Sequence, residues 1–143
     1  MSLNTIVRIH NKGPYRYEEY EAGETITPGQ LLEVNSDNEV IKHNSSATVA
    51  EYLFALENAL EGDDVDDTYA EGEVVCCLIG QSGTVVNALL NSGTNYTIGT
   101  IVESNGDGTL KAGSTAPIGV IEDEACDLSG SGAVDTLHPV RLL

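Results

Sequence analysis

Basic residues are scarce in this chain, and their scarcity limits the partners it can have. The 143 residues include 6 lysines and arginines against 23 aspartates and glutamates, which gives a formal net charge of −17. Proteins that follow nucleic-acid phosphates or lie on anionic membranes need clustered lysine and arginine side chains. We therefore expect neither nucleic acid nor a membrane among the partners. The acidity itself indicates a solvated surface that repels its own copies.

The sequence also lacks the spacings that mark catalytic and cofactor sites. It contains no H-E-x-x-H, no G-x-S-x-G and no glycine-rich phosphate loop ending in Gly-Lys-Ser/Thr. The three histidines, His10, His43 and His138, lie far apart in the sequence. We therefore assign no catalytic, cofactor-binding or metal-binding residue, and we predict a protein that is not an enzyme and carries no cofactor.

Cysteine is rare, with three residues and no C-x-x-C pair. Cys76 and Cys77 are adjacent, a spacing that strains a disulfide, and they lie in the apolar run from Val74 to Ile79. We interpret them as small buried hydrophobic residues in a reducing compartment. A run of this kind, without polar alternation, predicts a strand buried on both faces. No apolar stretch approaches a membrane span and no signal peptide precedes Arg8, so we expect a protein made in a cytosol.

Residues that favour turns, by contrast, are abundant. Fifteen glycines, frequent valine and threonine, and a turn signal about every ten residues predict an all-β fold. The length suits one domain with a substantial core.

One stretch occurs twice, at an offset of 70 positions. Residues 93–111 read as a turn, a short strand, an Asn-Gly-Asp-Gly reversal and a second strand, and residues 23–41 align with them without a gap. The identical residues of the first copy are Gly23, Thr27, Gly29, Glu33, Asn35 and Asp37. The alignment predicts a duplication, and two copies suit a pseudo-symmetric β-barrel or sandwich better than a solenoid.

These patterns divide the chain into segments. We expect residues 1–20 to form an N-terminal arm or a first strand, followed by a single β domain over residues 21–143. Within that domain we predict a first repeat (21–60, with a strand at 52–57), an acidic linker (61–72), central strands (73–90), a second repeat (91–125) and a closing strand (134–143). Pro139 lacks the N–H that a central strand needs, so it predicts an edge position for the closing strand.

The acidic linker raises the question of calcium. Counting from Asp63, the EF-hand pattern requires glycine where Thr68 stands and glutamate where Val74 stands, so the pattern fails. We interpret the linker as a solvated loop, with a weak divalent-cation site at 63–67 as the open alternative.

The first twenty residues concentrate tyrosine and arginine. Such side chains combine a large contact area with polar ends and are typical of binding surfaces. The candidate contact residues are Arg8, Tyr15, Arg16, Tyr17 and Tyr20. The alternative is a first strand whose tyrosine rings pack on the wall of a barrel.

Four segments resemble a known family. Residues 66–75, 83–90, 96–104 and 106–110 are similar to the head decoration, or capsid cement, proteins of tailed bacteriophages, and the resemblance covers about residues 20–125. It implies a small β-barrel or β-tulip, commonly a homotrimer, that binds the major capsid protein on the outside of the shell and stabilises it after expansion. It also implies a terminal arm that contacts the coat, here Met1 to Tyr20, and a location on the virion after assembly in the bacterial cytoplasm.

Two other functions stay open from the residues alone. One is a soluble β-domain that binds carbohydrate or a divalent metal, such as a host-surface adhesion module. The other is a small β-barrel enzyme, which a pocket joining His43 or His138 to two carboxylates would favour.

Overall fold

The chain folds into two five-stranded assemblies joined end to end. The computed structural model describes residue 6, residues 15–58 and residues 61–143, and within these ranges it has twelve strands and no α-helix. The predicted all-β class is confirmed. Accordingly, the described residues contain no helix long and apolar enough to cross a membrane.

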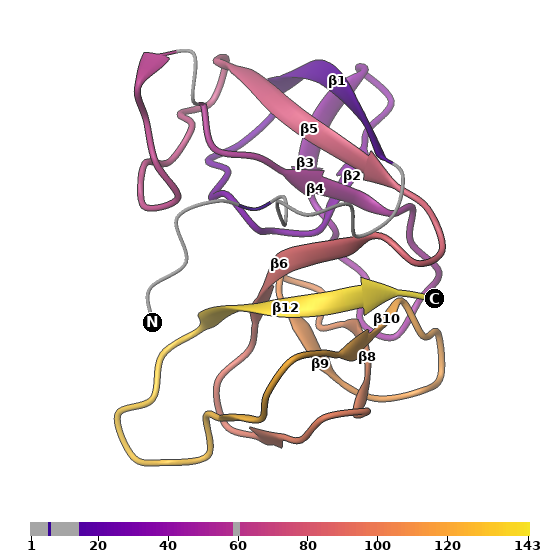
Figure 1. Cartoon of the computed structure of the whole chain (residues 1–143). Coiled ribbons are helices and arrows are strands. Elements are labelled where there is room, and N and C mark those ends of the chain that lie inside the picture. The colour runs from indigo at the N-terminus through magenta and orange to yellow at the C-terminus, as the bar shows by residue number, and fades with distance from the viewer. Residues whose placement is uncertain (1–5, 7–14, 59–60) are drawn as a thin grey trace.

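The first assembly, which we call the N-terminal sheet, lies at the top of Figure 1. Its strands follow the order β2-β3-β1-β5-β4. Their bounds are β1 Tyr15–Ala22, β2 Leu32–Val34, β3 Glu39–Lys42, β4 Leu53–Ala55 and β5 Val74–Gly80. Strand β1 is antiparallel to β5 along seven residue pairs, but it meets β3, in parallel, only at Glu21 and Ala22.

The second assembly, the C-terminal barrel, lies below the first in Figure 1. It is closed, in the order β10-β12-β6-β9-β8, with β10 and β8 paired to complete the ring. Its strands are β6 Val85–Leu90, β8 Ile101–Ser104, β9 Leu110–Ala112, β10 Gly119–Ile121 and β12 Thr136–Leu142. Two short strands, β7 Asn95–Tyr96 and β11 Cys126–Asp127, pair with each other beside it.

The two assemblies have the same strand order. Reading the barrel as β8-β9-β6-β12-β10 matches β2-β3-β1-β5-β4 strand for strand, and both contain one parallel pair, β1–β3 and β6–β9. In the N-terminal sheet a single bridge between Leu31 and Phe54 takes the place of the β8–β10 ladder. The N-terminal sheet is therefore an open counterpart of the barrel, whose two ends approach each other at that one bridge.

The repeat predicted at an offset of 70 is confirmed in the hairpins. The N–H of Asn35 donates to the carbonyl of Glu39 (2.8 Å), and the N–H of Asn105 donates to the carbonyl of Thr109 (2.9 Å). Asn38 and Gly108, which follow these asparagines by three positions, both have positive φ, 61° and 88°. Residues that tolerate the left-handed region are what these reversals require.

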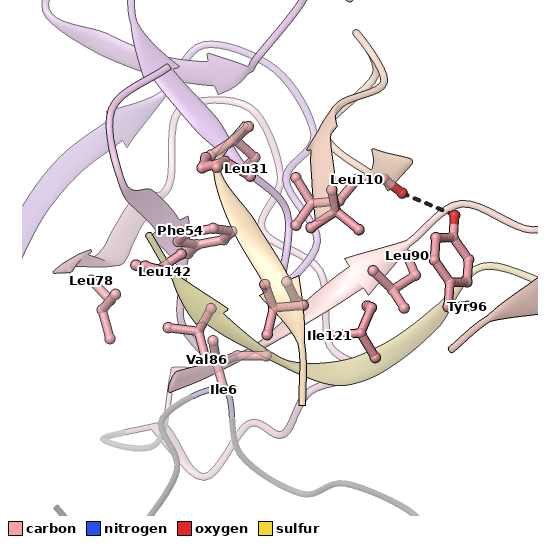
Figure 2. Close-up of a cluster of buried hydrophobic side chains, with 14 of the residues drawn as sticks. Ile6, Leu31, Phe54, Leu78, Val86, Leu90, Tyr96, Leu110, Ile121 and Leu142 are labelled. Atoms are coloured by element: carbon pink, nitrogen blue, oxygen red, sulfur yellow. Dashed lines mark hydrogen bonds between the residues drawn. The ribbon is translucent and has the colours of Figure 1, made fainter. Parts of the chain in front are cut away.

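One hydrophobic core runs through both assemblies. Figure 2 shows Leu31 and Phe54 of the N-terminal sheet beside Leu142 of the barrel. The buried cluster also includes Ile6, Leu78, Val86, Leu90, Tyr96, Leu110 and Ile121. A second, smaller cluster fills the N-terminal sheet around Ala22, Leu53 and Cys77. The two assemblies therefore pack against each other through a shared hydrophobic core.

Two expectations about individual strands are wrong. The apolar run of β5, a strand of the N-terminal sheet, is not buried on both faces, because Val74 is 54% exposed. Strand β12 is not an edge strand, because it lies between β10 and β6. Pro139 is accommodated because its carbonyl accepts from Glu122, beyond the last β10 residue, so its nitrogen faces a position where the ladder has ended.

Candidate functional site

The predicted contact residues lie mostly on one strand, β1, but on its two opposite faces. Arg8 is outside the described residues. Tyr15, Arg16 and Tyr17 are exposed, and Tyr20 is half-buried. Since side chains alternate along a strand, Tyr15 and Tyr17 share one face while Arg16 and Tyr20 share the other. The sequence therefore grouped side chains that the fold separates.

The tyrosine face consists of two rings in contact. Tyr15 and Tyr17 meet edge to face, with ring centroids 5.4 Å apart and an interplanar angle of 77°. The interaction with the Tyr15 hydroxyl, followed by burial, raises the pKa of Tyr17 to about 12. The two rings present an amphipathic surface, with Tyr17 62% exposed.

The opposite face of β1, which carries Arg16 and Tyr20 and which we call the arginine face, borders a shallow hollow of about 450 Å³ at Tyr20. Tyr20 lines it together with Val34, Val49 and His43. Val49 is 88% exposed and Val34 is 36% exposed. The sequence did not single out these valines because neither lies in a long apolar run. Arg16, Tyr20 and Val49 together provide a cation, an aromatic ring and an apolar side chain.

His43 and the carboxylates of Glu33 and Glu51 line the hollow, which is the combination that would favour an enzyme. His43, however, makes a structural contact. Its Nδ1 lies 2.6 Å from the hydroxyl of Ser104, and both residues are buried, at 3% and 1% exposure. The hydroxyl of Ser104 also accepts a hydrogen bond from the N–H of Gly106. The pair joins the end of the N-terminal sheet to strand β8 of the barrel, and a buried hydroxyl is out of reach of a substrate.

His138, the other histidine within the described residues, is structural as well. It is 6% exposed, and its Nε2 lies 2.8 Å from the carbonyl of Glu124 and 3.1 Å from that of Glu122. In the described part of the chain, no three His, Cys, Asp or Glu side chains gather as a metal site would need.

The acidic linker folds on itself. The N–H of Asp64 donates to the Asp67 carboxylate, and the N–H of Asp66 donates to the Asp64 carboxylate, both at 2.9 Å. These carboxylates act as turn-forming acceptors for neighbouring backbone groups.

A second hollow, of about 440 Å³, lies beside β5 on the outer face of the sheet. Cys76, Val74 and Asn58 line it with the carboxylates of Glu19, Glu61 and Glu73. Burial first, and then the charge of Glu19, raises the pKa of the Cys76 thiol. This hollow is therefore acidic and holds a protonated thiol.

The turn before β8 forms another exposed surface, which the sequence did not identify as functional. Ile98 is 65% exposed and Ile101 is 40% exposed, on either side of Gly99. The positions 70 residues earlier, Pro28 and Leu31, are buried. Comparing exposure across the repeat is the signal that reveals this surface.

No protein-family model and no curated protein sequence matches the chain. Among solved structures, it is similar to the head fiber gp8.5 N base in bacteriophage phi29, with a TM-score of 0.58 and 12% sequence identity. The similarity covers 91% of this chain and 95% of that chain. At this identity the likeness shows a shared fold, and it extends over both assemblies of the chain.

Proposed function

We propose that this protein is a structural component of a bacteriophage head, bound to the outer surface of the capsid, where it stabilises the expanded shell without catalysing a reaction. The observation that carries the proposal is the fold shared, over 91% of the chain, with the base of a head fiber. The resemblance of four sequence segments to capsid cement proteins supports the same role. The likeness in fold and the resemblance in sequence therefore support the same role.

The charge favours the outside of the shell. A net charge of −17 repels packaged DNA, and the exposed acidic surface keeps neighbouring virions apart. Assembly in the bacterial cytoplasm is part of the same proposal and agrees with three free cysteines.

We assign the capsid contact to the arginine face of β1. Arg16 is a rare positive charge on an acidic chain, and it shares its face with Tyr20, beside the hollow that carries Val49. Arginine, tyrosine and exposed apolar side chains are the groups that dominate binding energy at protein interfaces. A coat-protein surface with acidic and apolar groups would complement this face. In a homotrimer, three such weak contacts would act together on one shell.

The test is co-sedimentation of the full chain with expanded, DNA-free heads of the phage that encodes it. The wild type should saturate the heads and raise the temperature at which they dissociate. Arg16→Glu combined with Val49→Asp should lower the affinity at least about tenfold, corresponding to about 1.4 kcal/mol. Val134→Asp is the matched control, because Val134 is 70% exposed but lies in the loop before β12.

Absence of wild-type binding to heads would overturn the proposal. So would retention of a glycan or a divalent cation by a protein that ignores heads, which would support an adhesion module instead. Equal binding by the double variant and the control would reject the arginine face while leaving the capsid role in place.

A further inference from the structure

The two assemblies meet through a junction on the edge of β6, which β9 pairs only at Leu90. The turn Thr27–Leu31 of the N-terminal sheet lies against β6 of the barrel. The N–H of Leu89 donates to the carbonyl of Gly29 (3.0 Å), and the N–H of Leu31 donates to the carbonyl of Gly108 (2.8 Å). Gly29 also packs against Leu137, since a Cβ added to it would lie 2.3 Å from Leu137 Cδ2.

The barrel carries the same turn 70 residues later, bonded to β10 through Gly99 and Thr100, and among the described residues no second assembly covers its Gly99. In both turns the fourth residue donates to the first, from Gln30 to Thr27 (3.2 Å) and from Thr100 to Thr97 (3.0 Å). Gly29 and Gly99 have φ values of 92° and 87°. Within the part of the chain that the structure describes, no heavy atom other than those of its chain neighbours lies within 4 Å of a Cβ built on Gly99. The turn is therefore preformed, and its docking surface is open.

The N-terminal sheet carries the matching edge, on β1. By the 70-residue offset, Glu19 corresponds to Leu89 and Asn38 to Gly108. The N–H of Ala22 donates to Glu73, beside β5, so the N–H of Glu19 points to the opposite side by strand alternation. On that side, among the described residues, β3 pairs only with Glu21 and Ala22. The backbone edge at Tyr17 and Glu19 lies beyond this pairing.

We propose that the turn Thr97–Ile101 of one copy docks on the β1 edge of a second copy, repeating between molecules the junction found within each molecule. The carbonyl of Gly99 would accept from the N–H of Glu19, and the N–H of Ile101 would donate to the carbonyl of Asn38. Ile98 and Ile101 would lose their exposure, as Pro28 and Leu31 do inside the chain.

This contact is heterologous, since different surfaces of the two copies meet. It closes into a ring if the rotation between copies permits and extends into a filament if it does not. It engages the tyrosine face and edge of β1 and leaves the opposite face, with Arg16 and Tyr20, to another partner. The contact supplies a route to the proposed homotrimer, but it rests on the internal junction and not on capsid binding.

Charge sets the conditions under which the contact forms. Glu19 stands where the internal junction has Leu89, and Glu61 and Glu73 line the adjacent hollow. The turn Thr97–Ile101 is uncharged, but each copy has a net charge of −17. Association should therefore strengthen as salt screens the repulsion, with a Debye length of about 10 Å at 0.1 M and about 3 Å at 1 M.

Sedimentation velocity of the full chain, without heads, tests the contact at low and at high salt. The wild type should form oligomers at high protein concentration, and more of them in 0.5 M salt. Ile98→Asp should weaken association at least about tenfold, whereas the control Val134→Asp should leave it unchanged. Glu19→Pro removes the N–H that faces the open side and leaves the pairing with β5 intact, so it should weaken association without unfolding β1.

A disulfide trap tests the register of the contact. Cys76 pairs with Glu19 as Leu137 pairs with Leu89, so Cys76 occupies the place of the side chain that touches Gly29. Ile98→Cys, in a Cys126→Ala background, should form an intermolecular disulfide with the native Cys76 under catalysed oxidation. The matched Val134→Cys variant should not.

Monomers at every concentration and salt would overturn the proposal. Oligomers unaffected by both Ile98→Asp and Glu19→Pro would overturn it equally. Because these measurements use no heads, their failure is distinct from failure of the capsid role.

Discussion

The N-terminal sheet and the C-terminal barrel have one strand order but different surroundings. Leu31 has no exposed surface, whereas Ile101, its counterpart, is 40% exposed. Leu89 is half-buried at the junction, whereas Glu19, its counterpart, is exposed and charged. Similar local structure thus differs in exposure between the two assemblies. The difference lies in what covers each copy. The sequence follows that difference at Leu89 and Glu19, whereas Ile101 stays apolar although it is exposed.

The largest expected contrast is between Leu31→Ala and Ile101→Ala. Leu31 belongs to the core shared by the two assemblies, so its truncation should lower the free energy of unfolding by about 2–5 kcal/mol. Ile101→Ala should cost about 1 kcal/mol or less, because its side chain is already partly in water. Urea denaturation of the two variants measures both values. Equal losses would mean that the two positions are not in different environments.

The next contrast concerns two glycines of the repeated turn. Alanine at Gly29 or Gly99 adopts a left-handed conformation at a cost of about 1–2 kcal/mol. Gly29→Ala also drives its Cβ into Leu137, so it should cost about 1–3 kcal/mol more than Gly99→Ala. Thermal and urea unfolding of the pair give the difference. A Gly99→Ala variant as damaged as Gly29→Ala would contradict the open surface at the second turn.

A third contrast is between two adjacent cysteines of β5, Cys77, which is buried, and Cys76, which is half-buried. Burial raises the pKa of the Cys77 thiol from its ordinary 9.0 to about 12. The folded state therefore retains a proton that the unfolded state loses, and stability should fall as pH rises from 9 towards 12. At pH 10 the loss is about 1.4 kcal/mol.

Cys77→Val should remove this loss of stability at alkaline pH. Urea unfolding at pH 8 and pH 10 would measure the change in the free energy of unfolding. The matched variant Cys76→Val, at a half-buried position, should change the pH dependence less. The same drop between pH 8 and pH 10 in Cys77→Val as in the wild type would contradict the assignment.

The smallest effect tests the likeness of the two turns. Pro28 occupies the first central position of its turn, and Ile98 occupies the same position of the second turn. Proline is favoured there because its fixed φ suits the turn. Ile98→Pro should therefore raise the free energy of unfolding by about 0.4–1 kcal/mol, through a less flexible unfolded chain. Destabilisation on urea unfolding would show that the turns differ in backbone conformation.

Much of the local structure could be predicted from the sequence. Glycines and asparagines that accept positive φ mark the reversals, so the hairpins at 23–41 and 93–111 were recognisable and their repetition was visible. The strand order was not, because it depends on which strands bury their apolar faces together over long sequence separations. Strand β5 illustrates the limit, since its apolar run does not reveal that its partners are β1 and β4.

The candidate site shows the same division. Tyrosine and arginine near the N-terminus indicated a binding surface, but a list of residue types does not tell which face of a strand each occupies. Val49 and Ile98 were missed because they lie in a loop and a turn, where apolar residues follow no periodic pattern. Only their exposure in the folded chain, 88% and 65%, distinguishes them.

By itself the sequence determined the all-β class, the repeated hairpins and the strongly acidic surface, since turn chemistry and charge are properties of residues and their neighbours along the chain. The tertiary structure alone decided which copy of the repeated turn is buried and which is exposed. The reason is physical: burial depends on the surface that packs against a segment, and that surface comes from residues far away in the sequence.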